Sequence, residues 1–461
     1  MTLSLDWVIG HGIVGRKDLP VPELVFLWAA VTVLVVSFIA LAVLWPDPKL
    51  EGDRGWRRLL RVPAAVGAVA SAVCGAVGVF LLGFTVYAGL AGEQTAQANW
   101  APTFVYVIFW LGFAAASVLF GDVFRAFNPW RAIGRGVAGV AKLARGGRSL
   151  PSPLPYPERL GRWPAAAGIF AFAWMELAAS DGDMPRNVAI AALVYSAATF
   201  VAMALYGVDR WIERGEAFSV YFNLYSRISI WERRGEDVGV RWPLAGLAKL
   251  EPLPGTVALV AVMIGSVSFD GASEKKPWTQ IAPDMGEFFQ DLGLSPENGL
   301  VVTYTLGLLV AIGLVYGLYR LGVVGARSVG GGFTSERLAN AFVHSLVPIA
   351  FVYAAAHYMT LLIFQGQAIW FLASDPYGEG DDFFGTAGRA IDYGVIGANA
   401  TWYWQFGFVL LGHVAALILA HDRAVAMYRD AKHAVRSQYW MLGVMVVFTY
   451  LALWLLSEIG D

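Results

Sequence analysis

The sequence predicts an all-α bundle of about ten membrane-spanning helices, and three observations lead to that prediction. The chain of 461 residues is 57% hydrophobic and only 15% charged, against about 25% charged in soluble domains. Its apolar residues gather in ten stretches, most of them long enough to cross a hydrocarbon core about 30 Å thick. Its basic residues fall mainly in alternate gaps between those stretches. One integral membrane domain over residues 1–461 is therefore expected.

The ten predicted spans follow one another through the whole chain, and the fourth and sixth are short. No cleaved signal is expected before the first, because Met1–Glu23 contains two aspartates and lacks a basic start. The predicted spans are Leu24–Leu44, Ala65–Leu90, Thr103–Phe120, Ala165–Ala179, Asn187–Tyr206, Thr256–Phe269, Leu300–Leu321, Leu338–Phe364, Ala400–Ala420 and Trp440–Leu456.

The distribution of charge orients these spans. One set of alternate gaps consists of residues 45–64, 121–164, 207–255, 322–337 and 421–439. Together with Arg320, these gaps hold 27 of the 33 Lys and Arg and 15 acidic residues. The other side holds 6 basic and 19 acidic residues. Because basic residues near the ends of a span resist translocation, the basic side is predicted to be cytoplasmic and both termini extracytoplasmic. The protein is expected in the plasma (cytoplasmic) membrane, with its basic face against anionic lipid and no role for nucleic acid.

Several segments outside the spans carry their own signals. Gly121–Val140 and Asp209–Glu236 read as interfacial amphipathic helices on the cytoplasmic side. On the outer side, Asp284–Leu294 resembles a short acidic helix, and the long loop 365–399 is expected to form an ordered lid because it is rich in aromatic residues. The glycines Gly330–Gly332 precede a predicted helix N-terminus.

Ionisable residues inside the spans are the candidate functional residues, because burying them in a bilayer costs free energy. An inner layer is predicted from His344 and His413, with His421 and Asp422 at its cytoplasmic edge. An outer layer is predicted from Glu176 and His357, with His11 above them. Glu176, His357 and His344 are the candidate catalytic residues.

The two histidines of the eighth span are too far apart to share a ligand. His344 and His357 are thirteen residues apart, which corresponds to about 20 Å along a helix axis. A divalent metal (Zn, Mn or Fe) is therefore expected in one layer or the other, since imidazole and carboxylate are ligands for all three. The competing interpretation is structural, because a histidine inside a helix bundle can simply donate to a backbone carbonyl.

Other chemistry is limited by what the sequence lacks. The only cysteine, Cys74, permits neither a disulfide nor a thiolate metal site. The chain contains no phosphate-binding loop, no GxSxG nucleophile elbow and no HExxH zinc motif on a suitable element.

Seven motifs are spread over nearly the whole chain, namely His11–Pro20, Pro102–Gly112, Gly121–Arg131, Gly215–Phe222, His344–Ala350, Ala356–Tyr358 and Gly412–Arg423. Together they resemble a family of actinobacterial membrane proteins commonly labelled fenitrothion hydrolase. That resemblance implies hydrolysis of an organophosphorothioate ester, and it assigns no catalytic residue.

Three functions remain open at this point. The first is a metal-dependent membrane hydrolase acting on an apolar ester, in which a metal-bound water attacks phosphorus. The second is a transporter or channel for a small apolar molecule or an ion that uses the intramembrane Glu176 and histidines. The third is an electron carrier with a single haem between His344 and His413. Beyond the lipid bilayer, the sequence identifies no partner.

Overall fold

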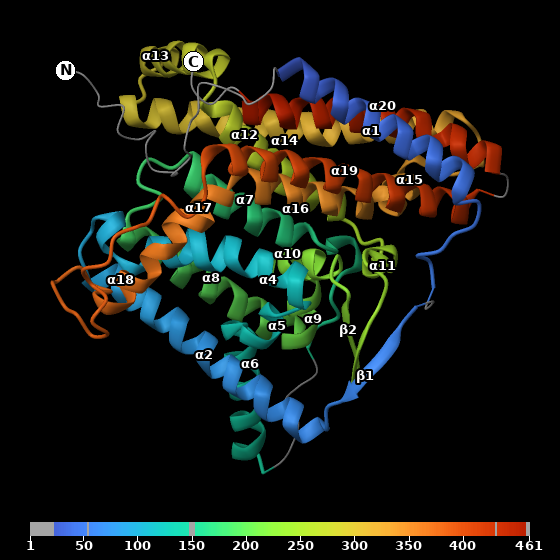
Figure 1. The fold of residues 1–461 in the computed structure, drawn as a ribbon. Helices are drawn as coiled ribbons and strands as arrows, with labels where there is room; N and C mark the ends of the chain where they lie inside the picture. The colour runs from blue at the N-terminus through green and yellow to red at the C-terminus, as the bar shows by residue number, and fades with distance from the viewer. Residues whose placement is uncertain (1–22, 53–54, 147–152, 429–430, 458–461) are drawn as a thin grey trace.

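The fold is known from a computed structural model, which describes residues 23–52, 55–146, 153–428 and 431–457. The described chain is mostly helical, as predicted, and its helices pack into one bundle (Figure 1). The long helices are α1 (Glu23–Leu44), α2 (Ala64–Ala91), α7 (Trp163–Leu177), α8 (Pro185–Tyr206), α12 (Thr256–Ser273), α14 (Pro296–Ser328), α19 (Ala398–Met427) and α20 (Ala431–Ser457).

The third and eighth predicted spans are helices interrupted by irregular turns. The third consists of α3 (Trp100–Pro102), the π-helical η3 (Thr103–Gly112) and α4 (Phe113–Phe120). The eighth consists of α15 (Ser335–Phe342), the 3₁₀ turn η5 (Val343–Ser345), α16 (Leu346–His357) and α17 (Met359–Phe364). Thr334 caps α15 by accepting a hydrogen bond from the Arg337 N–H, at the N-terminus predicted after the glycine run.

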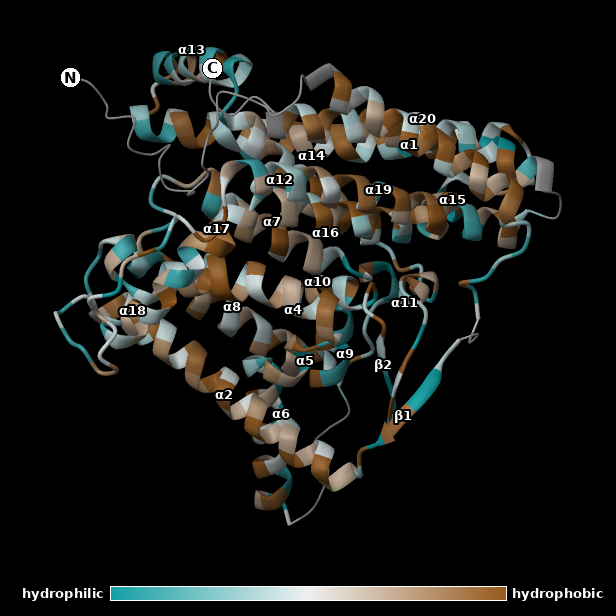
Figure 2. Cartoon of the chain, in the orientation of Figure 1, coloured by the Kyte–Doolittle hydropathy of each residue, from teal (hydrophilic) through white to brown (hydrophobic). Residues whose placement is uncertain are grey.

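Every predicted span thus coincides with helix, and the helical segments identify a multi-pass membrane protein. Within the described residues, eight helical segments are long and apolar enough to cross a membrane. The other two predicted spans coincide with α1, whose apolar stretch is Trp28–Leu44, and with α7, which has 15 residues. Apolar residues run along the helices, whereas polar residues concentrate at β1, at α13 and in the loops (Figure 2). Apolar side chains on α2 and α14 remain exposed, as lipid contact requires.

The helices form two groups joined by α7 and α10. In the first group α16 packs on α19, α14 on α12 and α20, and α1 on α19 and α20. In the second group α2 packs on α8 and on α6 (Pro129–Ala144). Helix α7 contacts both α12 and α10 (Ala217–Ser226), and α10 also contacts α4 and α16 (Figure 1). Gly168 makes the α7–α10 contact possible, because a Cβ there would lie 2.6 Å from the Cβ of Ala217.

The interfacial interpretation of the two segments predicted to be cytoplasmic is wrong for their central parts. Within Asp209–Glu236 the structure has α9 (Val208–Arg214), α10 and a strand, and every α10 residue except Asn223 is buried. Within Gly121–Val140 it has α5 (Phe124–Phe127) and α6, and Trp130 is 4% exposed rather than anchored at the lipid interface. Tertiary packing takes up the aromatic face that the sequence pattern assigns to lipid.

The remaining elements lie at the two ends of the bundle (Figure 1). A small antiparallel sheet of order β1-β3-β2 pairs Arg57 with Val240 and Trp231 with Val240; the sequence does not predict it. Helix α13 contains the predicted acidic helix as far as Asp291, and the predicted loop 365–399 begins with the 3₁₀ turn η6 and the short helix α18. These elements are β1 (Arg57–Arg61), β2 (Trp231–Arg234), β3 (Asp237–Val240), η2 (Ala96–Ala98), η4 (Glu158–Leu160), α11 (Ala245–Ala248), α13 (Lys276–Asp291), η6 (Gln365–Gln367) and α18 (Ala368–Ser374).

Candidate functional site

A buried carboxylate that the sequence interpretation missed organises the outer layer. Helix α12 continues to Ser273, beyond the predicted end of the sixth span at Phe269, and so carries Asp270 into the bundle. The Asp270 carboxylate accepts a hydrogen bond from the Tyr358 hydroxyl at 2.6 Å and lies 3.0 Å from Nε2 of His357. All three residues are at most 3% exposed. Asp270 directly follows the apolar run that ends at Phe269. A predicted span extended by one residue would have included it among the ionisable residues inside the membrane.

A helix break brings His357 and Tyr358 to the same carboxylate. Helix α16 ends at His357 and α17 begins at Met359, with Tyr358 between them at φ −97° and ψ 13°. In an uninterrupted helix, neighbouring side chains point about 100° apart. The Ala356–Tyr358 motif therefore forms a bend whose two polar residues both reach Asp270.

Glu176 lies in the neighbourhood of this group, near the end of α7. Its Oε2 atom is buried and has no hydrogen-bond partner among the described residues. Helix α7 packs directly on α12, and Glu176 lies close enough to Asp270 that a charge on one carboxylate disfavours a charge on the other. The structure thus places the two predicted outer-layer residues, Glu176 and His357, around Asp270.

Aromatic residues surround this acidic group. The Trp110 indole N–H donates to the Tyr221 hydroxyl at 2.9 Å, and the Trp110 ring centroid is 4.9 Å from that of Tyr358. Trp110 belongs to the π-helical η3, whose wider turn is a form that recurs at functional sites. The sequence analysis placed Tyr221 on the aromatic face of Asp209–Glu236 and Trp110 within a predicted span, but it gave neither residue a role in a site, since aromatic residues are ordinary features of membrane helices.

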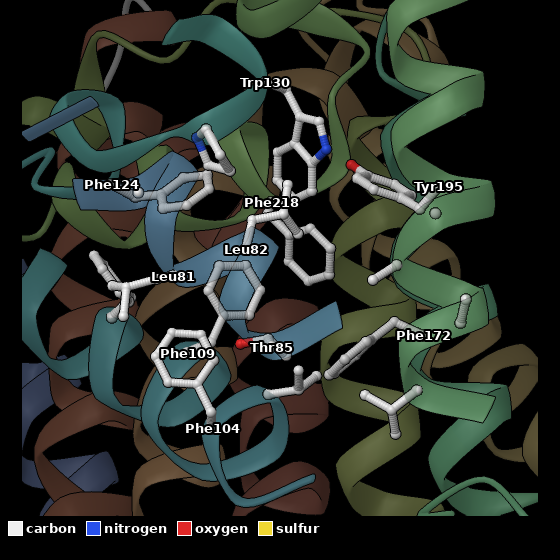
Figure 3. A pocket seen from close by; sticks show the side chains of 18 of the residues that line it. Leu81, Leu82, Thr85, Phe104, Phe109, Phe124, Trp130, Phe172, Tyr195 and Phe218 are labelled. Carbon is white, nitrogen blue, oxygen red and sulfur yellow. The ribbon is translucent and has the colours of Figure 1, made fainter. Parts of the chain in front are cut away.

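A cavity of about 200 Å³ adjoins this group of residues. Aromatic and aliphatic side chains from eight elements line it, and Figure 3 shows their rings turned toward a common space. The main lining residues are Leu81, Leu82 and Thr85 of α2, Phe104 and Phe109 of η3, Trp130 of α6, Phe172 and Met175 of α7, Ala192 and Tyr195 of α8, and Phe218 of α10.

The few polar atoms on the cavity wall are already hydrogen-bonded. Thr85 accepts from the Trp100 indole, and the Trp130 indole donates to Ser196 at 2.8 Å. The Tyr195 hydroxyl donates to the carboxylate of Glu216, which also caps the N-terminus of α10. The cavity therefore presents an apolar surface to any molecule inside it.

A chain of aromatic side chains connects the cavity wall to Asp270. Phe172, on the cavity wall, stacks edge-on against Trp110 with their centroids 5.5 Å apart. Trp110 in turn contacts Tyr358, which donates to Asp270. Met175 lines the cavity and is followed directly by Glu176.

The inner-layer histidines are buried but have separate surroundings. His344 lies in η5, and neither of its ring nitrogens has a well-formed hydrogen bond within the described part of the chain. His413 Nδ1 lies 2.7 Å from the carbonyl oxygen of Val409, one turn back on α19. That contact is the structural role that the sequence interpretation left open for it.

His421 and Asp422 hold the segment that follows α1. The two His421 ring nitrogens lie 3.1 Å from the Gln438 side-chain oxygen and 3.0 Å from the Trp45 carbonyl oxygen. The Asp422 carboxylate accepts from the Trp45 indole and from the backbone N–H groups of Lys49 and Leu50. Each side chain thus has partners that account for its burial.

The structure does not gather the predicted metal ligands into one group. In the ranges that it describes, no three His, Cys, Asp or Glu side chains lie where they would hold a metal ion together. His11, predicted for the outer layer, lies outside the described residues. The metal stays a prediction, and the geometry that is present is an acid, histidine and tyrosine group beside an apolar cavity.

Comparison with known proteins adds no relative: no family model, no curated protein and no solved structure matches this chain.

Proposed function

We propose that this protein is a proton-coupled transporter of a small apolar molecule across the cytoplasmic membrane. The observation that supports it best is the juxtaposition of the Asp270–His357–Tyr358 group and Glu176 with an apolar cavity inside a multi-pass bundle. Ionisable residues within membrane helices are rare, and they mark ion paths and proton relays.

The acidic group is suited to take up and release a proton. Glu176 and Asp270 repel each other, and a proton on either carboxylate removes that repulsion. His357 and Tyr358 already contact Asp270, so each can pass a proton to it without a large movement. The unpaired Oε2 of Glu176 offers a second position for the proton.

The cavity is suited to a compact neutral molecule. An engineered apolar cavity of about 150 Å³ holds benzene, so about 200 Å³ has room for a substituted single ring. Aromatic walls favour a ring that packs against them edge-on or offset. Because its polar wall atoms are already bonded, the cavity offers no compensation for desolvating a charged molecule.

The contact between the two parts supplies a route for coupling. A molecule in the cavity touches Phe172 and Met175, and Phe172 reaches Tyr358 through Trp110. A change in the position of Phe172 therefore alters the hydrogen bond from Tyr358 to Asp270. Coupling between two sites requires that each changes the free energy of occupying the other.

A metal-dependent hydrolase is the second candidate, because an apolar cavity beside acid–base groups also suits an apolar ester. The resemblance to proteins labelled fenitrothion hydrolase favours this candidate, and Glu176 and His357 would supply its acid–base chemistry. Stoichiometric Zn, Mn or Fe in purified protein, together with release of phenol from an organophosphorothioate ester, would support it.

Proteoliposomes separate the two candidates. Protein is reconstituted with a pH-sensitive dye inside the vesicles, and an acid-outside pH gradient is imposed in the presence of a panel of neutral aromatic esters. A transporter gives ester accumulation that collapses with the gradient and is accompanied by proton entry. A hydrolase gives phenol at the same rate with and without the gradient.

A pair of variants on one helix connects the transport to the cavity. Ala192→Leu fills the cavity and should abolish ester accumulation. Val194→Leu, on the same helix but 64% exposed, should leave accumulation unchanged. Equal accumulation by both variants would refute the cavity as the binding site.

A further inference from the structure

A second cavity, of about 220 Å³, lies among residues predicted to be cytoplasmic, and it is polar where the first is apolar. It is bounded by Asp122, by Arg162 just before α7, and by residues of α9 and α10. Five arginines and three carboxylates line it, so its wall carries a difference of two positive charges (5 − 3 = 2). No histidine lines this cavity, and neither Asp270 nor His357 is part of its wall. It is therefore separate from the Asp270–His357–Tyr358 group.

The three carboxylates already have partners on the cavity wall. Glu251 pairs with Arg214 at 3.1 Å, and Glu213 pairs with Arg125 at 3.8 Å. The Asp122 carboxylate accepts from the Asn223 amide at 2.9 Å.

The remaining three arginines form no ion pair with any carboxylate in the described residues. Arg162 donates through Nη1 to the Glu251 carbonyl oxygen and the Thr256 hydroxyl. Arg227 donates to the Asn223 side-chain oxygen and the Gly246 carbonyl oxygen. Both guanidiniums are thus bonded only to neutral acceptors. Arg210, the third, is exposed at the cavity mouth.

Burial makes this excess charge costly. Arg162 is 5% exposed, and its Nε is buried without an acceptor in the part of the chain that the structure describes. Burial away from water, followed by repulsion from Arg227, lowers the pKa of the Arg162 guanidinium to about 10. Buried charges in proteins are normally paired, so a missing counter-charge is the simplest completion of this cavity.

We propose that this cavity is a binding site for a phosphate group, held by Arg162, Arg210 and Arg227. A phosphate carries about −1.5 to −2 charges near neutral pH and several acceptor oxygens, which match the two excess positive charges. Guanidinium groups bind such oxygens in pairs, with charge-assisted hydrogen bonds. The phosphate belongs either to a soluble cytoplasmic anion or to the headgroup of an inner-leaflet lipid.

Two binding measurements on full-length protein test the site and distinguish the two sources. In the first, inorganic phosphate is titrated by calorimetry into delipidated protein in detergent at constant ionic strength. In the second, the protein is placed in nanodiscs of phosphatidylcholine with or without phosphatidic acid, and its thermal stability is compared. A ligand that binds only the folded state raises the unfolding temperature.

Saturable binding in either measurement supports the site, and the measurement that gives it identifies the source. Arg210→Gln should weaken that binding by about tenfold, the effect of losing one charge-assisted hydrogen bond. Arg227→Gln should weaken it at least as much. Because Arg210 is exposed and unpaired within the described chain, its variant should fold normally even if Arg227→Gln does not.

The control is Arg58→Gln, an arginine of β1 with a side chain 60% exposed and outside the cavity. It should bind phosphate as the unmodified protein does. No saturable binding in both measurements, or an equal loss in Arg58→Gln and Arg210→Gln, would overturn the proposal. The site does not depend on the proposed transport function, because both measurements report phosphate binding directly and the two cavities share no lining residue.

Discussion

Replacing Asp270 with Asn should separate function from stability. The substitution keeps the shape of the side chain but removes its charge and one acceptor oxygen. Because Asp270 is the acceptor for Tyr358 and lies against His357, the variant should lose gradient-driven uptake. In the proposed mechanism Glu176 cannot replace Asp270, because its buried Oε2 has no hydrogen bond to Tyr358 or His357.

The expected change in stability is small because two large effects oppose each other. Two hydrogen bonds to a charged acceptor are lost or weakened, at about 1.5–3 kcal/mol each. Against this, the folded state no longer holds a carboxylate that is 3% exposed, and the effective cost of burying one ion is several kcal/mol. Relief of the repulsion with Glu176 acts in the same direction. The net change should therefore stay within about 2 kcal/mol.

Both quantities can be measured on one preparation. Thermal unfolding is followed through the reactivity of the single thiol, Cys74, and uptake through a pH-sensitive dye in proteoliposomes. The matched variant Tyr358→Phe removes one hydrogen bond to Asp270 without changing its charge, and it should retain partial uptake. Full uptake by Asp270→Asn would refute the role of this residue. Destabilisation of 3–5 kcal/mol, the cost of breaking a buried ion pair, would show a structural role instead.

Three further predictions concern helix packing, the Asp422 hydrogen bonds and the loop 365–399. Gly168→Ala should destabilise the protein by about 1–3 kcal/mol, because its Cβ collides with α10; Gly136→Ala, with open space around it, should be neutral or stabilising in the same thermal assay. Asp422→Ala leaves three hydrogen-bond donors unpaired. The free energy of unfolding, measured by thermal unfolding, should therefore fall by about 3 kcal/mol or more, and a fall of under about 1 kcal/mol would contradict this. The Ala387 N–H and the Ser374 hydroxyl donate to Asp382 and hold its pKa below the ordinary value. The ionised Asp382 therefore stabilises the loop 365–399 fully above pH of about 4, the ordinary pKa of an aspartate. That stabilisation is lost as the pH falls through the lowered pKa of the folded protein. Limited proteolysis should cut this loop faster at neutral pH in Asp382→Asn than in unmodified protein, and equal rates would contradict the role of Asp382.

Much of the site follows from the order of spans, but its central residue does not. Span order alone places Glu176 and His357 at one depth, and the structure puts both around Asp270. Asp270 was missed because it stands at the end of an apolar run, where an acidic residue normally faces water. Only the continuation of α12 to Ser273 and its burial by α7 and α16 reveal that this carboxylate is inside.

The inner layer illustrates the opposite limit. Equal depth suggests that His344, His413 and His421 belong together, but depth leaves the direction of each side chain undetermined. His413 turns back to its own helix, and His421 reaches toward Trp45 and Gln438. Side-chain direction depends on helix rotation and on neighbours remote in sequence.

By itself the sequence determined that this is a multi-pass helical membrane protein. The length of the apolar stretches and the positions of Lys and Arg both reflect the free energy of transferring each residue into a bilayer, which depends on the residue itself. It also identified the buried residues that most need an explanation. The tertiary structure alone decided which of them meet, because the helix break at Tyr358, the close α7–α10 contact at Gly168 and the buried course of α10 arise from packing between distant segments. The apolar cavity and the arginine-lined cavity are products of that same packing.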